Sequence, residues 1–225
     1  MNTKPLNFVL IGRSGSGKGT QAELLKEKFP NLYHIVTGDL FRKLGNAETD
    51  TSHQIKKILD AGGLPLDDIA TTLWMYEISF NVKEGQGILA DGFPRRLKEA
   101  KNLDRFLGFL DRKPNTFYLL IDISRKEAFD RLTKRRICKK CGKLIPWVGE
   151  FKKLTVCNKC GGDLMTRMDD KVEAIKNRLD YYEENVVPVV EYYKKQNKLI
   201  KINGEQTIEK VFEDIFKAIK LNVKK

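Results

Sequence analysis

The glycine-rich segment at residues 12–20, with the sequence GRSGSGKGT, constrains this chain more than any other stretch. An apolar run at residues 6–11 precedes it and a helical pattern follows, so we expect a strand, a glycine loop and a helix in that order. Glycines let the backbone curl until several N–H groups face one anion, and the helix dipole and Lys18 add positive charge. The segment therefore predicts a site for a chain of phosphates.

One position in this loop departs from the general phosphate-binding pattern. That pattern carries Ser or Thr directly after the lysine, whereas this chain carries Gly19 and only then Thr20. Because a hydroxyl that commonly binds Mg²⁺ is missing, we expect the ligand's phosphates and water to hold most of the metal's coordination sites. The alternative is a glycine-rich turn that only joins a strand to a helix, which the preceding strand argues against.

Four further apolar runs alternate with helical segments along the chain. The expected strands are residues 6–11, 34–36, 87–90, 116–123 and 199–202. This alternation predicts an α/β fold, in which helices cover both faces of a five-stranded parallel sheet and ligands bind at the carboxyl ends of the strands. Ser124 and Glu127 form a capping box that begins one helix. Asp169 and Asp170 are expected to begin a long helix that Pro188 kinks.

Composition narrows the class of protein. A chain of 225 residues suits one core with small insertions, and 41% hydrophobic and 32% charged residues are ordinary for a soluble protein. The sequence has no apolar run of about 18 residues and no apolar leader at the amino terminus, so we expect a cytoplasmic protein without a membrane partner. The net charge of +12 favours polyanionic ligands, for which both nucleic acid and nucleotides qualify.

All four cysteines lie in one window, as two C-x-x-C pairs with 15 residues between them. The pairs are Cys138 with Cys141 and Cys157 with Cys160. This spacing is typical of a tetrahedral site in which four thiolates hold a structural zinc ion and leave no open position for catalysis. Disulfide bonds are the competing interpretation, which a cytoplasmic compartment disfavours.

A zinc knuckle of this kind can also bind nucleic acid, and the basic residues around it would suit that role. Its position argues against this, because it lies between two core helices that carry arginines on both borders. Those arginines are Arg131, Arg135, Arg136, Arg167 and Arg178. A segment so placed can swing these cations over the phosphate loop, so we expect an enzyme in preference to a nucleic-acid-binding nucleotide switch.

Four motifs in order along the chain resemble those of the adenylate kinases, and in particular the bacterial members with a zinc-bearing lid. They are the loop ending GKGT, TGD at residues 37–39 with Arg42, DGFPR at residues 91–95, and TRxDD at residues 166–170 with Arg178. The resemblance covers nearly the whole chain. It implies a three-layer fold similar to the P-loop NTPases, with a core at residues 1–36, 66–134 and 171–225, a monophosphate-binding arm at 37–65 and a zinc lid at 135–170.

The resemblance further implies reversible transfer of the terminal phosphoryl group of ATP to AMP, giving two ADP, with Mg²⁺ as cofactor and structural Zn²⁺ in the lid. Such a transfer brings several negative charges together, so the protein must supply cations, alignment and exclusion of water, and it needs no covalent nucleophile. ATP and a nucleoside monophosphate are then the partners. No nucleic acid partner is expected, and the chain is expected to act as a monomer.

The resemblance also assigns roles to individual residues. The residues expected to be catalytic are Lys18, Arg95, Arg135, Arg167 and Arg178. ATP is expected at Gly15, Ser16, Gly17, Lys18, Gly19, Thr20, Arg131, Arg135 and Gln206. The monophosphate is expected at Thr37, Arg42, Gly63, Leu64, Pro65, Gly92, Phe93, Pro94, Arg95, Glu99, Arg167 and Arg178. Asp91 is expected to orient Mg²⁺ through water, and the four cysteines to hold the zinc ion.

Glu99 departs from the family's pattern, since adenylate kinases carry Gln there to read the monophosphate base. A Gln amide donates to adenine N1 and accepts from the N6 amino group, whereas an ionised Glu only accepts. Two acceptors suit guanine or a cytosine amino group better than adenine, so a preference for GMP or CMP is the alternative. In a third interpretation Glu99 points to solvent or uses one oxygen on N6, and backbone carbonyls near Leu64 and Pro65 complete adenine recognition.

Overall fold

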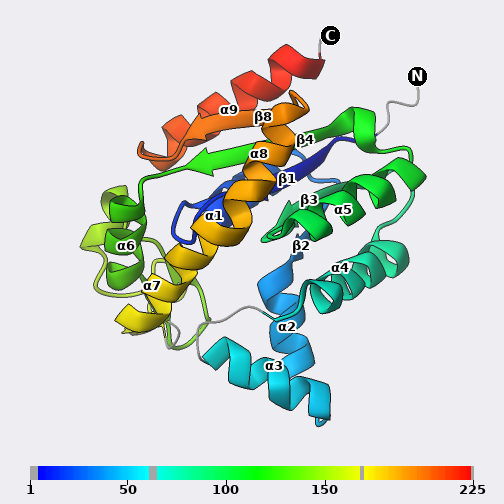
Figure 1. Cartoon of the computed structure of the whole chain (residues 1–225). Coiled ribbons are helices and arrows are strands. Elements are labelled where there is room, and N and C mark those ends of the chain that lie inside the picture. The colour runs from blue at the N-terminus through cyan, green and yellow to red at the C-terminus, as the bar shows by residue number, and fades with distance from the viewer. Residues whose placement is uncertain (1–4, 61–64, 168–169, 224–225) are drawn as a thin grey trace.

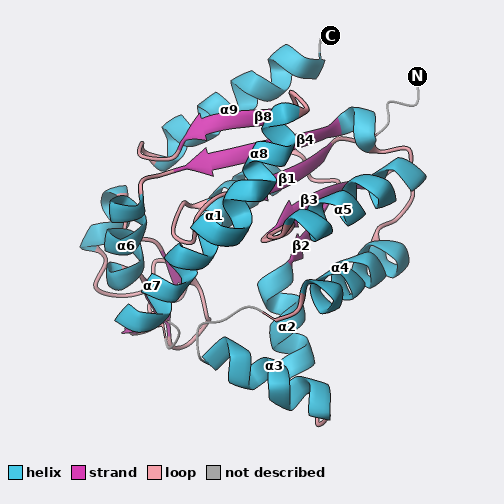
Figure 2. Cartoon of the chain, viewed as in Figure 1, coloured by secondary structure: helices cyan, strands magenta, loops and turns pink. Residues whose placement is uncertain are grey.

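The computed structural model describes residues 5–60, 65–167 and 170–223, and its centre is a parallel sheet of five strands (Figures 1 and 2). The order across the sheet is β2–β3–β1–β4–β8, and each neighbouring pair is parallel. The strands are β1 (Asn7–Ile11), β2 (Leu32–Val36), β3 (Gly87–Asp91), β4 (Thr116–Asp122) and β8 (Leu199–Asn203). The prediction of a five-stranded parallel sheet is confirmed.

Helices cover both faces of this sheet and give three layers. Helices α1 (Lys18–Lys28) and α9 (Ile208–Val223) pack on one face. On the other face lie α4 (Asp67–Asn81), α5 (Leu97–Phe109) and α8 (Val187–Lys195), with α8 crossing in front of the sheet in Figure 1. A short 3₁₀ turn, η1 (Lys113–Asn115), leads into β4. The expected three-layer α/β fold, similar to the P-loop NTPases, is confirmed.

Alternating side chains of β1 explain why the core has two halves. Phe8 and Leu10 pack on the side of α1 and α9, whereas Val9 and Ile11 pack on the side of α5 and α8. Successive side chains of a strand point to opposite faces, and a central strand of a covered parallel sheet is buried on both. All five residues of β1 are buried accordingly. The strand that leads into the glycine loop is therefore fixed from both sides.

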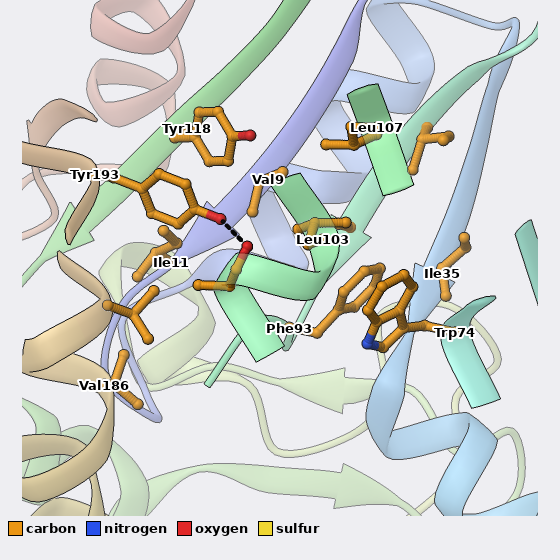
Figure 3. Close-up of a cluster of buried hydrophobic side chains, with 14 of the residues drawn as sticks. Val9, Ile11, Ile35, Trp74, Phe93, Leu103, Leu107, Tyr118, Val186 and Tyr193 are labelled. Carbon is orange, nitrogen blue, oxygen red and sulfur yellow. Dashed lines mark hydrogen bonds between the residues drawn. The ribbon is translucent and has the colours of Figure 1, made fainter. Parts of the chain in front are cut away.

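An aromatic pair in the second half of the core fixes the segment after β3. Trp74 of α4 stacks on Phe93, with ring centroids 5.3 Å apart and ring planes 9° from parallel (Figure 3). Both side chains are almost completely buried. Because the Phe93 ring fills the core, this residue offers a ligand only its backbone.

Helices α2 (Thr37–Gly45) and α3 (Asp50–Asp60) extend beyond the sheet, at the bottom of Figure 1. They pack against α4 through a small cluster of Phe41, Ile55 and Ala70. Two helices are thus inserted between β2 and α4. The division that assigns residues 37–65 to a separate arm stays a prediction.

The segment between α6 (Arg125–Lys134) and α7 (Val172–Tyr181) forms its own small antiparallel sheet in the order β6–β5–β7. Its elements are β5 (Arg136–Cys138), β6 (Leu144–Ile145), the 3₁₀ turn η2 (Gly149–Lys153) and β7 (Leu164–Thr166). Strand β5 pairs with β7 so that Arg136 lies opposite Thr166. The chain therefore leaves and re-enters the body of the protein at one place. The assignment of residues 135–170 as a lid stays a prediction.

The long helix after this segment differs from expectation at its start. A start at Asp169 and Asp170 is wrong, because α7 begins at Val172; Asp169 itself lies outside the described residues. Asp170 instead uses its carboxylate to bind two arginines, as shown below. Further along, a π-helical turn, η3 (Tyr182–Val186), separates α7 from α8. Pro188 follows it as the second residue of α8, and because the helix continues without a break from η3, the missing N–H of Pro188 leaves one helical hydrogen bond unmade. The expected kink at Pro188 stays a prediction.

Candidate active site

The glycine loop joins β1 to α1 at the carboxyl end of the sheet. A Cβ on Gly12 would lie 2.4 Å from the carbonyl oxygen of Ile121, so the loop passes β4 too closely for any side chain there. Gly17 is the N-cap of α1 and has a φ of 96°, a left-handed conformation that favours glycine. The loop thus ends at the positive end of the α1 dipole, where backbone N–H groups bind anions.

Lys18 begins α1 and turns back over the loop. Its Nζ donates hydrogen bonds to the carbonyl oxygens of Gly12 and Arg13, each at 2.8 Å. Burial lowers the pKa of Lys18 to about 8, against an opposing effect of Asp91. A bound phosphate chain adds negative charge beside this ammonium group and favours its charged form. The lysine is therefore arranged for an anionic ligand.

Asp91 ends β3 next to the start of α1 and is 8% exposed. Its Oδ2 lies 3.7 Å from the position that a Cβ on Gly19 would take. Gly19 is the place where the general loop carries a metal-binding hydroxyl. A carboxylate oxygen, which Mg²⁺ prefers as a ligand, thus stands beside the missing hydroxyl. The donor set fits the expected water-mediated contact to Mg²⁺.

Two neighbouring cavities open at this edge of the sheet. The first is lined by Leu10, Ile11, Gly12, Ser14, Lys18, Gly92, Pro94, Arg95, Arg178, Tyr181, Tyr182 and Val186. The second is lined by Thr37, Phe41, Pro65, Asp67, Ala70, Gly92, Arg95, Arg96, Glu99 and Tyr181. Gly92, Arg95 and Tyr181 line both cavities. One cavity therefore contains the glycine loop, the other faces α2 and α4, and Arg95 lies at their boundary.

The turn after β3 fixes Arg95 at this boundary. Its Nε donates to the carbonyl oxygen of Gly92 at 2.6 Å. Its backbone N–H donates to Oε2 of Glu99, also at 2.6 Å. The Phe93–Pro94 peptide bond is cis. A guanidinium fork held in this way suits the oxygens of a phosphate group.

Glu99 lines the second cavity and is 2% exposed. Besides the N–H of Arg95, its carboxylate accepts a hydrogen bond from the indole Nε1 of Trp74 at 3.1 Å. Burial raises the pKa of Glu99, against an opposing effect of the hydrogen bond from the Arg95 backbone. The interpretation in which Glu99 points to solvent is wrong, because both of its oxygens bind buried donors.

Asp170 brings two of the predicted catalytic arginines together. Its Oδ1 accepts hydrogen bonds from Nη2 of Arg135 at 2.7 Å and from Nη2 of Arg178 at 2.6 Å. Arg135 ends α6, and Arg178 projects from α7 into the first cavity. Burial opposes ionisation of Asp170, but the hydrogen bonds from both arginines outweigh it and lower the pKa. One carboxylate therefore positions cations from both sides of the small antiparallel sheet.

The four cysteines converge at one point of that sheet, and their Sγ atoms all lie within 4.8 Å of one another. Sγ of Cys138 lies 3.5 Å from Sγ of Cys160, and Sγ of Cys141 lies 3.7 Å from Sγ of Cys157. Four sulfurs bound to one tetrahedral zinc ion stand roughly 3.8 Å apart, given Zn–S bonds of about 2.3 Å. The backbone N–H of Lys159 donates to Sγ of Cys157, and such contacts lower the pKa of this thiol to about 6. This donor set fits a zinc ion.

Comparison with known proteins connects this site to one family. A sequence model described as adenylate kinase matches residues 10–198. The chain belongs to the adenylate kinase family. An adenylate kinase of Methanocella arvoryzae is 41% identical over 216 residues, which cover 96% of this chain and 99% of the relative. An adenylate kinase of Thermoanaerobacter pseudethanolicus is 37% identical over 220 residues, covering 95% of this chain and 98% of the relative. One of Bacillus cereus is 40% identical over 213 residues, covering 93% and 96%.

In this adenylate kinase family member, two of the residues expected to bind ATP, Arg131 and Gln206, lie close together outside the lining of the two cavities. Arg131 is 6% exposed and donates from Nη2 to the carbonyl oxygen of Gly204 at 2.9 Å. Its Nε also binds Glu127 at 2.6 Å. Gln206 follows two residues after Gly204, and its amide donates to Asp214 at 3.0 Å. Arg131 and the loop that contains Gln206 are therefore neighbours, and their roles in binding ATP stay a prediction.

Two buried hydroxyls at the site have no hydrogen-bond partner among the residues that the structure describes. They belong to Ser16 of the glycine loop and Thr37 of the second cavity. A buried polar group without a partner is costly, so these hydroxyls favour a polar ligand beside them. Of the other expected loop residues, Gly15, Gly19 and Thr20 lie in the loop or the first turn of α1.

Several expected site residues lie apart from the described lining of the cavities. Arg42 is exposed and binds Asp39, and Arg167 contributes to neither cavity. The carbonyl oxygen of Pro65, which lines the second cavity, accepts a hydrogen bond from Arg96 at 3.3 Å. The predictions for Gly63 and Leu64 fall outside the described residues.

The sequence analysis missed two tyrosines of the first cavity, Tyr181 and Tyr182. They follow Arg178 by three and four residues, which places all three side chains on one face of the helix. This spacing is the signal that identifies them, because the functional face of a helix continues into the next turn.

Among the described residues, no helix is both long and apolar enough to span a bilayer.

Proposed function

We propose that this chain catalyses the reversible transfer of the terminal phosphoryl group of ATP to AMP, which yields two ADP. The pair of cavities that share Arg95 carries the proposal: one contains the glycine loop and Lys18, the other contains Glu99 and Thr37. A reaction between two nucleotides needs two adjoining sites with a cation at their junction. The relatives named adenylate kinase span nearly the whole chain, which favours AMP over the GMP or CMP alternative and over a nucleic-acid switch.

The side chains at the site divide the work of this transfer. Lys18 and the loop N–H groups bind the donor phosphates, and Arg95 binds the acceptor phosphate. Arg135 and Arg178, held by Asp170, neutralise the charge that builds up on the group in transfer. Mg²⁺, oriented by Asp91 through water, supplies further positive charge when it is bound with ATP. Arg42 and Arg167 complete the site when the segments that carry them move inward.

We further propose that residues 37–65 and 135–170 close over the two nucleotides as an arm and a lid. Water is the competing acceptor of the phosphoryl group, so closure prevents hydrolysis of ATP. Zinc bound by the four cysteines keeps the lid rigid; every ligand position is filled by protein, so this metal takes no part in the chemistry. The proposed location is the cytoplasm, whose reducing conditions keep the thiols able to bind zinc. The proposed unit is a monomer, since one chain supplies both cavities.

A steady-state assay tests the function. The purified chain is incubated with Mg²⁺ and ATP and with AMP, GMP, CMP or UMP, and the nucleoside diphosphates formed are separated and quantified. We expect AMP to give the highest kcat/KM and two ADP per turnover. Hydrolysis of ATP that AMP does not stimulate would contradict the proposal, and a higher kcat/KM with GMP or CMP would replace AMP as the acceptor.

A further inference from the structure

Arg13 is the one charged side chain of the glycine loop besides Lys18, and the function proposed above assigns it no role. Its side chain is only 14% exposed. Nη2 binds Oε1 of Glu183 at 2.5 Å, and the guanidinium carbon lies 4.2 Å from the centre of the Tyr182 ring. The guanidinium group is therefore held by an ion pair and by a cation–π contact at once.

The backbone of Arg13 takes part in the donor site. Its carbonyl oxygen accepts hydrogen bonds from Nζ of Lys18 at 2.8 Å and from the N–H of Ser16 at 3.1 Å. A residue whose side chain is fixed at both contacts has little freedom to turn its peptide group. The position of the Arg13 side chain thus sets the direction of its own carbonyl group, and this carbonyl accepts the hydrogen bond that holds Lys18 in place.

The partners of Arg13 lie where the long helix changes from α-helical to π-helical geometry. Tyr182 and Glu183 belong to the π-helical turn η3, which follows α7 and precedes α8. Helix α7 carries Arg178, which Asp170 joins to Arg135 on the opposite border of the zinc-binding segment. Single π-helical turns within helices are common at functional sites. Arg13 therefore connects the phosphate loop directly to the helix that supports the catalytic arginines.

We infer that Arg13 is a positioning residue for ATP: through Tyr182 and Glu183 it holds the phosphate loop, and with it Lys18, in register with the helix that carries Arg178. The inference rests on the proposed function and deepens it at the donor half of the site. Loss of Arg13 should weaken ATP binding and leave AMP binding nearly unchanged, because the second cavity contains neither Arg13 nor its two partners.

The test compares Arg13→Met, Arg13→Lys and Glu183→Gln with the unaltered chain. We expect Arg13→Met to raise KM for ATP roughly five- to tenfold, the combined effect of one ion pair and one cation–π contact, with KM for AMP within about twofold. Arg13→Lys keeps the charge but loses the planar stack, so its KM for ATP should be intermediate. Glu183→Gln should add almost nothing to the Arg13→Met change, since both remove the same ion pair.

Arg125→Met is the matched control. It breaks the ion pair of Arg125 with Asp180, which has a length of 2.6 Å and joins α6 to α7 without a residue of the glycine loop in the pair. If Arg13 serves stability alone, Arg13→Met lowers Tm and leaves KM for ATP unchanged, and that result overturns the inference. A parallel rise in both KM values, or additive effects of the Arg13 and Glu183 changes, overturns it too.

Calorimetric titration of each variant with ATP alone separates this inference from the proposed function. A weaker Kd for ATP in Arg13→Met, with an unchanged Kd in Arg125→Met, supports the inference even if the unaltered chain transfers nothing to AMP. An unchanged Kd in Arg13→Met overturns the inference while the assay with AMP stands on its own.

Discussion

Glu99 shows how a single side chain serves the core and the site together. One carboxylate oxygen binds the indole N–H of Trp74 and the other binds the backbone N–H of Arg95. Two acceptors thus satisfy two buried donors, which an amide with one acceptor oxygen cannot do in the same geometry. The departure from the family's Gln therefore has a structural reason inside this protein, besides any effect on the base.

We expect Glu99→Gln to lower the free energy of unfolding by about 1–3 kcal/mol, because one buried donor loses its acceptor. The same variant should retain AMP as the best acceptor, since its amide can donate to adenine N1. Thermal denaturation and kcat/KM for the four monophosphates measure both effects. Glu77→Gln serves as control, because the carboxylate of Glu77 accepts a hydrogen bond from the hydroxyl of Tyr33 and an amide oxygen can replace that acceptor. Equal stability of Glu99→Gln and the unaltered chain would contradict this account.

At the level of single residues, the sequence predicted which residues belong to the site but not which residues contact one another. The glycine loop, the cysteine quartet and the arginines of the site are recognisable because their residue types and spacing carry the chemistry. The contacts of Asp170 with Arg135 and of Arg13 with Glu183 were not predictable, since these pairs lie 35 and 170 residues apart along the chain. Only the fold decides which of many charged residues meet.

Among the elements, those set by local pattern were predicted and those set by distant contacts were not. The hydroxyl of Ser124 accepts a hydrogen bond from the N–H of Glu127 at 3.2 Å, which is one half of the predicted capping box. The other half is absent, because the N–H of Ser124 donates to Glu205 instead of Glu127. By contrast, β6 has two residues and β5 and β7 have three each, which is too short for any periodicity. The π-helical turn η3 also lacks a sequence signal, because Tyr182 and Val186 continue the helical pattern.

The small antiparallel sheet allows a prediction about its metal. We expect Cys157→Ser to lower the zinc content of the purified chain and its Tm, with residual activity at low temperature, since the proposed zinc ion supports the proposed lid and takes no part in the transfer. Metal analysis per chain and thermal inactivation curves measure these effects. Asn158→Ser, an exposed position in the same knuckle, should change neither. An unchanged zinc content in Cys157→Ser would refute the assignment.

At the level of the whole molecule, the net charge of +12 acts on substrates before they reach the site. A positively charged protein attracts polyanions from a distance. Salt screens this attraction, and the screening length is about 10 Å at 0.1 M ionic strength. We expect kcat/KM for ATP to fall severalfold as KCl rises from about 0.05 to about 0.5 M, while kcat at saturating substrate changes little. Steady-state kinetics at several salt concentrations measure this. A kcat/KM that does not depend on salt would show that the excess of lysines has no part in substrate capture.

The pairing of β5 with β7 also bears on how such chains can change over time. Arg136 lies opposite Thr166, so the segment between them begins and ends at the same point on the body of the protein. Insertions whose ends meet can be exchanged without displacing the elements at their base. A replacement that joins α6 to α7 by a shorter, metal-free segment would therefore leave the five-stranded sheet in place. The proposed zinc site is in this sense separable from the fold of the five-stranded sheet, which forms without any residue of this segment.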